Sequence, residues 1–317
     1  MRKLLWVVLI AAGSTAGCVD PVTRLVNDVR TPVSAGSLEH YVTEGPLTAV
    51  NRSGQGDAAA AKLIPLLKDN DISIREGAVG YLGGLQADSR LVVPVLIEAY
   101  ADPQLRISAT GAFGRIGPVD EKVVATLILA LKDENPRVRD LAIKAFQEMG
   151  PRGAAAVPAL TDTLSDKILG NEAAQALGRI GHRARPAVLA LTEMAKSAKG
   201  YDRLHAAVAL WDITQDPDIA VPALTELLKD SFLPLRRAAA IELGTIGPAA
   251  HAAIPALILA SDLKQIPRAE HPPLSRESSR LESRAAEPYD LIVRSAAIEA
   301  LRNIQGNEPP NNFFLNN

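Results

Sequence analysis

A phrase that recurs at a nearly constant period constrains the fold of this 317-residue chain more than any other feature. In a typical copy an acidic residue is followed four residues later by Arg and three residues after that by Ala, then by a second small residue beside a large apolar one. The position of Arg75 recurs at 106, 139, 170, 203, 236 and 294, so the period is 31 or 33 residues until an insertion of about 25 residues lengthens the last one. The seven copies are Asp71–Gly83, Asp102–Gly114, Asn135–Phe146, Asp166–Gly178, Arg203–Leu210, Arg236–Gly244 and Asp290–Leu301.

A second apolar segment, usually with a proline, precedes these phrases. Examples are Ile64-Pro65, Val93-Pro94, Val157-Pro158, Val221-Pro222 and Ile254-Pro255. Proline fits the first turn of a helix, because the N–H that it lacks would have no intrahelical partner there. We therefore predict two helices per period, the first opening at the proline and the second ending at a glycine that adopts a left-handed cap. These glycines are Gly117, Gly150, Gly181 and Gly247.

The spacing inside the second helix predicts how the pairs pack. Ala109, Ala112 and Phe113 lie three and four residues apart, which places them on one face of a helix. The alanines allow a neighbouring helix to approach closely, and one pair cannot bury its apolar face without the next. The predicted fold is therefore an all-α solenoid, a right-handed superhelix of about seven helix pairs.

This pattern resembles the HEAT-repeat family, in particular its short bacterial form, the phycobilin-lyase-type HEAT-like repeats. The resemblance covers about residues 57–306. It implies a stack of helix pairs whose second helices line a concave face. Some phycobilin-lyase relatives attach pigments, but such repeats serve many binding roles, so the resemblance implies the fold and not that activity.

Composition agrees with packed helices and narrows the function. Hydrophobic residues make up 47% of the chain and aromatic residues 4%, which suits helices better than an aromatic-rich sheet. A net charge of −2 provides no global field to attract nucleic acid or an anionic membrane. Cys18 is the only cysteine, which excludes an internal disulfide and a cysteine-rich metal site.

Residues 1–17 have the layout of a secretory signal peptide. Arg2 and Lys3 precede an apolar run at 4–12, which is shorter than the ~20 apolar residues that a membrane-spanning helix needs. The following Thr15-Ala16-Gly17-Cys18 resembles the lipobox of bacterial lipoproteins, apart from Thr15, where that family usually has Leu. The resemblance implies lipidation of Cys18 and an exported protein anchored to the cell envelope, facing the periplasm or at the cell surface. Cleavage without lipidation, which gives a soluble exported protein, is the alternative.

Three other segments lie outside the helix-pair pattern. Residues 18–56 are interrupted by Pro and Gly and are predicted to form a tether, with short helices considered near 22–29 and 38–42. The insertion at 265–288 is rich in Pro, Ser, Arg and Glu and is predicted to be a disordered loop, with a partner-binding loop as the alternative. Residues 307–317 are predicted to be a flexible tail, with docking of its adjacent Phe residues as the alternative.

The recurring Asp and Arg residues are the most visible polar feature. Because they return at the same repeat position, we interpret them as structural, each Arg bonding a carboxylate or a helix-end carbonyl. A basic stripe for an acidic partner is the alternative. The residues are Asp71, Asp102, Asp166, Asp290, Arg75, Arg106, Arg139, Arg203, Arg236 and Arg294.

The exposed side of the second helices is the predicted partner-binding surface. Its charges are mixed in sign, and an ordinary solvated face is the alternative. By helical offset it includes Glu76, Arg115, Lys144, Glu148, Gln175, Arg179, Asp212, Arg237, Glu299 and Asn303.

No motif predicts catalysis, a cofactor or a metal. The sequence has no GxSxG, no phosphate-binding glycine loop after a strand and no CxxCH, and its histidines lack metal-ligand spacing. These histidines are His40, His182, His205, His251 and His271.

The sequence therefore predicts a membrane-tethered scaffold, not an enzyme, that binds a protein partner on the concave face and binds no nucleic acid. The alternative is a lyase-type enzyme or cofactor-handling accessory protein, which a pocket containing His205, Trp211 and Asp212 would support. A purely structural envelope protein is the third interpretation.

Overall fold

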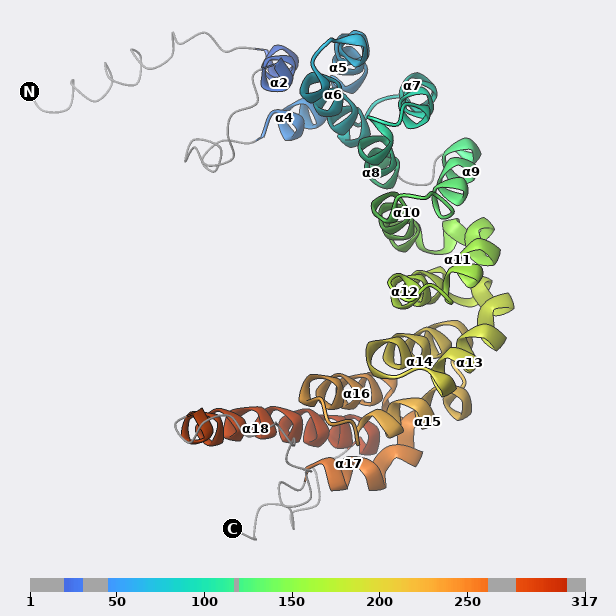
Figure 1. Cartoon of the computed structure of the whole chain (residues 1–317), viewed down its shortest axis with the longest axis vertical. Helices are drawn as coiled ribbons and strands as arrows, with labels where there is room; N and C mark the ends of the chain where they lie inside the picture. Colours follow the sequence, from blue (N-terminus) through green and yellow to red (C-terminus); the bar gives the residue numbers. More distant parts are fainter. Residues whose placement is uncertain (1–19, 31–44, 117–119, 262–277, 307–317) are drawn as a thin grey trace, which may run out of the picture. The chain divides into compact units, whose positions relative to one another are not determined.

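The computed structural model of the chain describes residues 20–30, 45–116, 120–261 and 278–306. These residues form helices and the connections between them, with no strand among them (Figure 1). The chain divides into unit 1, Met1–Ala145, and unit 2, Phe146–Asn317. The boundary falls inside helix α10, Pro136–Met149. The predicted all-α class is confirmed.

Unit 1 pairs its helices in two layers. Helices α6 and α8 lie side by side in one layer, and α7 and α9 contact each other in the second. The elements before α10 are α2 (Pro21–Arg30), α4 (Pro46–Ser53), α5 (Gly56–Leu63), η1 (Ile64–Lys68), α6 (Ile72–Gly84), α7 (Ser89–Ala101), α8 (Arg106–Ile116) and α9 (Glu121–Ala130).

Helices α2 and α4 lie in the part of the chain predicted to be a tether. Val22, Leu25 and Val29 of α2 are buried, and α2 packs against α4, α5 and α6. The structure thus differs from the predicted linker at 18–56, because Pro21 and Pro46 begin helices there instead of interrupting them. The predicted signal peptide and Cys18 lie outside the described residues.

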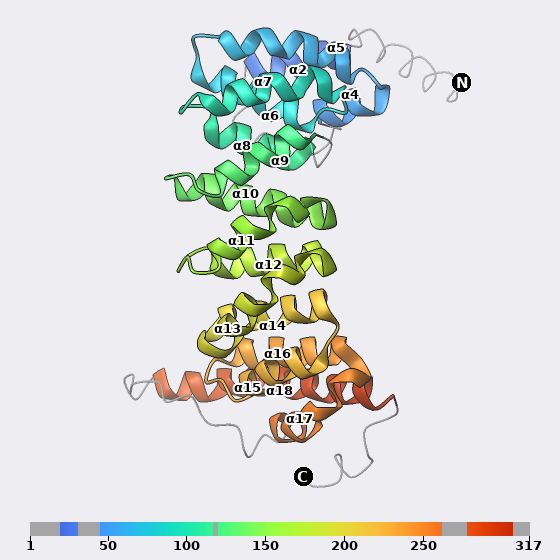
Figure 2. The ribbon, with the colours of Figure 1, turned by 90° about the vertical axis from the view of Figure 1, so that its right-hand side faces the viewer.

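Unit 2 continues the alternation of first and second helices. We call the layer of α12, α14, α16 and α18 the second-helix layer, and α11, α13, α15 and α17 lie on its other side (Figures 1 and 2). The elements are η2 (Gly150–Ala156), α11 (Val157–Thr163), α12 (Gly170–Ile180), η3 (Gly181–Ala187), α13 (Val188–Ser197), α14 (Gly200–Thr214), α15 (Pro217–Leu227), α16 (Leu233–Ile246), η4 (Gly247–Ala253), α17 (Ile254–Ser261) and α18 (Ser278–Gln305).

Glycines end the second helices as predicted. Gly150, Gly181 and Gly247 have φ angles of 54°, 70° and 70°, a region that favours glycine. Each begins a short 3-10 helix that leads to the next first helix. Gly117, which was predicted to act in the same way, lies outside the described residues.

The prediction that first helices open at their proline is wrong for α7 and α15. These helices begin at Ser89 and Pro217 and carry Pro94 and Pro222 inside them. An aspartate caps each one before its proline is reached. The Asp88 carboxylate, for example, accepts a hydrogen bond of 2.9 Å from the backbone N–H two residues later.

The recurring Arg side chains bond to helix ends. The Nη1 atoms of Arg75 and Arg139 each donate to the carbonyl oxygen six residues earlier, at 2.8 and 2.9 Å. The Nε atom of Arg203 donates to a carbonyl oxygen five residues earlier, at 3.0 Å. Asp71 accepts a hydrogen bond of 2.8 Å from the backbone N–H two residues later, which caps α6. The structural interpretation is confirmed for these residues.

The last repeat differs from its predicted boundaries. Helix α18 begins at Ser278, inside the range 265–288 predicted as a disordered loop. The part of that range before 278 lies outside the described residues, as does the predicted tail at 307–317.

One stretch of the described residues, Leu233–Ser261, is long and apolar enough to cross a membrane by length and composition alone. It is not a continuous α-helix, because Gly247 divides it into α16, η4 and α17. Several of its apolar side chains, including Leu243 and Leu257, are buried in the core of unit 2. It is therefore weak evidence for a membrane span.

Candidate partner-binding surface

Several pairs of consecutive second helices meet through a glycine on one helix and an alanine on the next. A Cβ atom added to Gly83 of α6 would lie 2.5 Å from the Cα atom of Ala112 of α8. One added to Gly244 of α16 would lie 2.9 Å from the Cα atom of Ala300 of α18. Cβ atoms do not approach backbone so closely, so these two places require glycine. We call such a meeting a glycine–alanine junction.

The α14–α16 junction departs from this pattern, whereas the α12–α14 junction keeps it. Gly178 of α12 lies against Ala209 of α14, where an added Cβ atom would be 3.2 Å from the Cα atom. One 33-residue period later, Trp211 stands at the glycine position and Glu242 at the alanine position. The backbones of α14 and α16 pack together less extensively than those of α12 and α14, and the indole of Trp211 is partly buried against the apolar cluster of these helices. A carboxylate thus interrupts a line of small buried side chains.

The charge of Asp212 acts on the carboxyl group of Glu242. Burial raises the pKa of Glu242, and the Asp212 charge raises it further. Desolvation by the surrounding protein raises the pKa of Asp212 as well, although the Arg179 charge lowers it. Within the described residues, neither carboxylate makes an ion pair shorter than 4.0 Å. The two carboxyl groups therefore share a site on which Arg179 acts from beyond ion-pair distance.

Two predicted residues, Arg179 and Asp212, thus meet at this site. Asp212 is exposed and reaches over Gly178, since a Cβ atom added there would lie 3.1 Å from Oδ2. A third predicted residue, Gln175, has its Nε2 atom 3.3 Å from Nδ1 of His205, which joins α12 to α14. Burial lowers the pKa of His205, and a nearby carboxylate on the same helix opposes this shift.

Sequence reasoning missed Glu242. The first and sixth copies of the phrase are those that replace the second small residue, with Tyr81 and Glu242. The Tyr81 hydroxyl donates a hydrogen bond to the Asp28 carboxylate of α2, so its polar group has a partner. Glu242 has no such partner among the described residues. The detectable signal was the departure itself, a charge where Ala112, Ala145, Ala176, Ala209 and Ala300 stand in the other copies.

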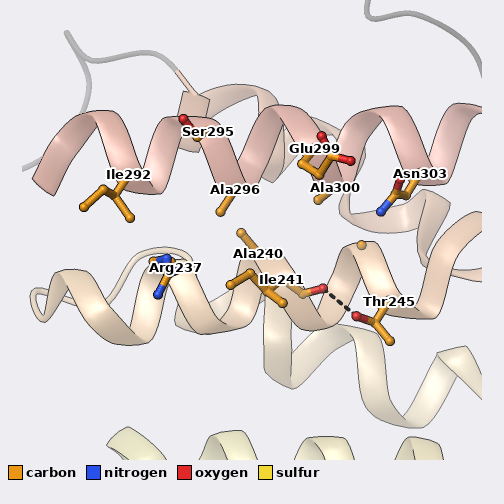
Figure 3. Close-up of a pocket in the computed structure, with 11 residues that line it drawn as sticks. Arg237, Ala240, Ile241, Thr245, Ile292, Ser295, Ala296, Glu299, Ala300 and Asn303 are labelled. Carbon is orange, nitrogen blue, oxygen red and sulfur yellow. Dashed lines mark hydrogen bonds between the residues drawn. The ribbon is translucent and has the colours of Figure 1, made fainter. Parts of the chain in front are cut away.

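Three further predicted residues line an open groove between α16 and α18. They are Arg237, Glu299 and Asn303, and the cavity volume is about 540 Å³. Figure 3 shows Ala240 of α16 and Ala296 of α18 pointing toward each other across it. The apolar lining continues with Ile241 and Ile292, which are 43% and 41% exposed. The groove therefore presents apolar surface to water between polar side chains.

The remaining predicted residues are less concentrated. Arg115 on α8 donates from Nη2 to the Gly80 carbonyl oxygen at 3.1 Å, and burial lowers its pKa. Lys144 forms an ion pair with a carboxylate one turn away on α10, at 2.9 Å. Glu76 on α6 and Glu148 on α10 are exposed. No described contact links these four residues into one site.

A second groove of about 560 Å³ lies on the other side of unit 2, where Thr192 of α13 faces Pro222 of α15. Neither groove includes His205, Trp211 or Asp212, the set that would support a lyase-type pocket. Within the described parts of the chain, no group of three or more His, Cys, Asp or Glu side chains could hold a metal ion.

Comparison with known proteins identifies the repeats. The family model of HEAT repeats matches residues 93–178 and 124–211. The matched residues lie in the central part of the chain, from α7 to α14. No curated protein sequence matches the chain as a whole or in part. The predicted solenoid class is confirmed by the family match.

Several solved structures are similar to this chain. An engineered protein is 20% identical with a TM-score of 0.51, and the match covers 91% of this chain and 79% of that one. The complex of CpcE and CpcF of phycocyanin lyase from Nostoc sp. PCC7120 is 24% identical with a TM-score of 0.46, covering 78% and 92%. The archaeal HEAT-like repeats protein from Thermococcus onnurineus NA1 is 16% identical with a TM-score of 0.37, covering 87% and 98%. At 20% identity the likeness to the engineered protein is one of fold alone.

Proposed function

We propose that this chain is a non-enzymatic scaffold that binds a protein partner through the exposed side of the second-helix layer in unit 2. HEAT repeats support a binding role, because stacked helix pairs present a long surface that is ordered before binding. The observation that carries the proposal is the Glu242 carboxyl group, which stands beside Asp212 at the one junction of this layer where a tryptophan replaces glycine.

A basic side chain of the partner would fit this site. Desolvation raises the pKa values of Glu242 and Asp212, and repulsion by the Asp212 charge raises that of Glu242 further, so ionising both groups is costly. An Arg or Lys placed between them converts that repulsion into attraction. Buried charge pairs at interfaces contribute through the dissociation rate, and removing one partner typically costs ~2–5 kcal/mol.

Neighbouring charges restrict which partner fits. Arg179 on α12 and Arg237 on α16 belong to the same layer as the two carboxylates. A uniformly basic surface would meet repulsion from these guanidinium groups, whereas a single basic side chain flanked by polar or acidic groups would not. We therefore expect a protein partner with that local pattern, and no nucleic acid.

A photo-crosslinking experiment tests the proposal. A photoreactive amino acid replaces Thr245 on α16 in one variant and Leu189 on α13 in another, both exposed and on opposite sides of unit 2. We expect a specific partner to crosslink at position 245 and not at 189. Equal crosslinking from the two positions would contradict the proposed surface.

Charge reversal then tests the residues. With the captured partner, the double variant Asp212→Lys/Glu242→Lys is expected to bind at least about 100-fold more weakly, which corresponds to ~2.7 kcal/mol. The matched control is Glu193→Lys/Glu226→Lys, which reverses two exposed carboxylates on α13 and α15. If both double variants lose the same affinity, the effect is a general one of net charge and the proposal fails.

We further propose that the scaffold is exported and anchored to the cell envelope through lipid on Cys18. The support is the signal-like sequence at 1–17 and the single cysteine that follows it. Several acyl chains hold a protein stably at a membrane, since each buried CH₂ contributes ~0.8 kcal/mol. The Cys18→Ala variant is expected to leave the membrane fraction, and unchanged membrane retention would contradict the anchor.

A further inference from the structure

We propose that the C-terminal segment of this same chain, residues 307–317, binds in the α16–α18 groove through Phe313, Phe314 and Leu315. The proposal does not depend on the partner site at Asp212 and Glu242. It concerns a different junction and a different kind of contact, in which apolar side chains cover an apolar surface.

The groove has the chemistry of a peptide site. Ala240, Ile241, Ala296 and Ala300 provide a continuous apolar lining from two neighbouring helices, and Ile292 extends it toward the start of α18 (Figure 3). The two backbones approach closely at the glycine–alanine junction of Gly244 and Ala300, and these two residues form the floor of the groove. The cavity volume of about 540 Å³ is within the range of small-ligand and side-chain pockets.

The segment carries the side chains that such a groove accepts. The chain has only five phenylalanines, and two of them are adjacent at 313 and 314. Of the three described phenylalanines, Phe113 and Phe146 are fully buried, whereas Phe232 is 51% exposed. Leu315 extends the apolar run, and Glu308 is the only charged residue between 307 and 317. Burial of the Phe-Phe-Leu run would remove more apolar surface from water than any other part of the segment could.

The chain leaves α18 beside one end of the groove. Asn303 and Thr245 line the end of the groove that is nearest to the end of α18. Gly306 has a φ of 68°, and its N–H donates to the Arg302 carbonyl oxygen at 3.0 Å. This left-handed cap ends the helix and lets the chain change direction.

The length of the segment is sufficient. The distance along α18 from Gly306 back to Ala296 is ~15 Å at 1.5 Å per residue. The connection from Gly306 to Phe313 spans up to ~23 Å when extended. Pro309 and Pro310 favour extended backbone in this connection, which limits the entropy that docking removes. Phe313 and Phe314 therefore reach the apolar lining with length to spare.

Disulfide trapping in the full chain tests the contact. All variants carry Cys18→Ser, so that no native thiol remains. One variant adds Ile241→Cys and Phe314→Cys. The matched control adds Leu259→Cys and Phe314→Cys, where Leu259 is 52% exposed on α17 and does not line the groove. Under mild oxidation we expect the Ile241 pair to form an intramolecular bridge at least about tenfold faster than the control, at a rate independent of protein concentration.

Other outcomes would overturn the proposal. Equal bridging rates in the two variants would show a segment without a preferred site. Bridges that form only between molecules, at a rate that rises with concentration, would assign the groove to a second copy of the chain.

Competition with a peptide provides a second measurement. A labelled peptide of residues 307–317 is titrated into the wild-type chain and into the variant Phe313→Ser/Phe314→Ser/Leu315→Ser. A short tether gives the attached segment an effective concentration of order 1 mM, so a peptide with a Kd of about 0.1 mM should bind the wild type roughly tenfold more weakly than the variant. Adding Ile241→Asp to the variant should abolish binding. Equal affinity for the wild type and the variant, or no binding to either, contradicts occupation by the attached segment.

Discussion

The α12–α14 and α14–α16 junctions occupy equivalent places in consecutive repeats but are formed by different kinds of side chain. At the first, Gly178 lies against Ala209 and the two backbones run close together. At the second, Trp211 and Glu242 replace this pair, and the helices have fewer close approaches. The first junction is explained by packing alone. The second junction is less closely packed and contains a carboxyl group that packing does not require.

This difference shows how a repeat protein acquires a specific site. Residues that recur in most copies, such as Arg75 and Arg139, bond to helix ends and maintain the stack. A binding site must differ from its neighbours, or the partner would bind in several registers along the solenoid. Glu242 breaks the repeat, and its carboxyl group has no protein partner among the described residues; that combination supports the binding role proposed above.

The largest expected effect is at the tightest glycine–alanine junction. Gly83→Ala places a Cβ atom 2.5 Å from Ala112, and the resulting overpacking should cost about 3 kcal/mol in the free energy of unfolding. Gly80→Ala is the matched control on the same helix, because its Cβ atom would meet only the Arg115 guanidinium group at 3.9 Å. The control should be neutral or stabilising by up to about 1 kcal/mol. Urea denaturation followed by circular dichroism measures both, and equal losses would refute the close-packing account.

At the contrasting junction, Trp211→Ala is expected to cost about 2 kcal/mol. The indole is partly buried and packs against the apolar cluster of α14 to α18, so its removal leaves a cavity between α14 and α16. Trp211→Phe should lose less than half as much. A loss below about 0.5 kcal/mol for the alanine variant in the same denaturation assay would mean that the tryptophan does not separate the helices.

A smaller gain is expected from Glu242→Gln at neutral pH. Because the folded-state pKa of Glu242 is raised, its contribution to stability is full below its ordinary value of 4.5 and is lost as pH rises through the raised value. The glutamine variant avoids that loss. It should be more stable than wild type by less than about 1 kcal/mol at pH 7, after allowance for solvent screening, and equal to it near pH 4. Partner affinity should fall in the same variant, so a gain in stability with unchanged affinity would separate Glu242 from function.

The smallest effect is expected at the α12–α14 junction, where the pH dependence has the opposite sign. Burial lowers the pKa of His205, so the unfolded chain takes up a proton first as pH falls through the ordinary value of 6.5. Wild-type stability should therefore decrease between pH 7 and 5.5, by less than about 0.5 kcal/mol. His205→Gln should remove that slope while leaving the Glu242 transition at lower pH in place. Parallel thermal melts at several pH values compare the two junctions directly.

The local parts of the structure followed from the sequence. The helix pairs, the glycine caps at Gly150, Gly181 and Gly247, and the bonding of the recurring Arg residues were predicted, because each depends on contacts within one repeat. The starts of α7 and α15 were not, because an aspartate cap several residues before the proline decides them. Helix α2 was interpreted as part of a tether, because its short apolar face at Val22, Leu25 and Val29 becomes buried only when helices such as α6 pack against it.

The sequence by itself determined the period and the small residues that let neighbouring helices touch, because these features repeat along the chain at the spacing of a helix. The tertiary structure decided which exposed side chains come together. Arg179, Asp212 and Glu242 come from three successive second helices, and their common electrostatic environment exists only when those helices are stacked. Desolvation and Coulomb interaction depend on distance in space and on the exclusion of water, and neither is encoded in the spacing of residues along one helix.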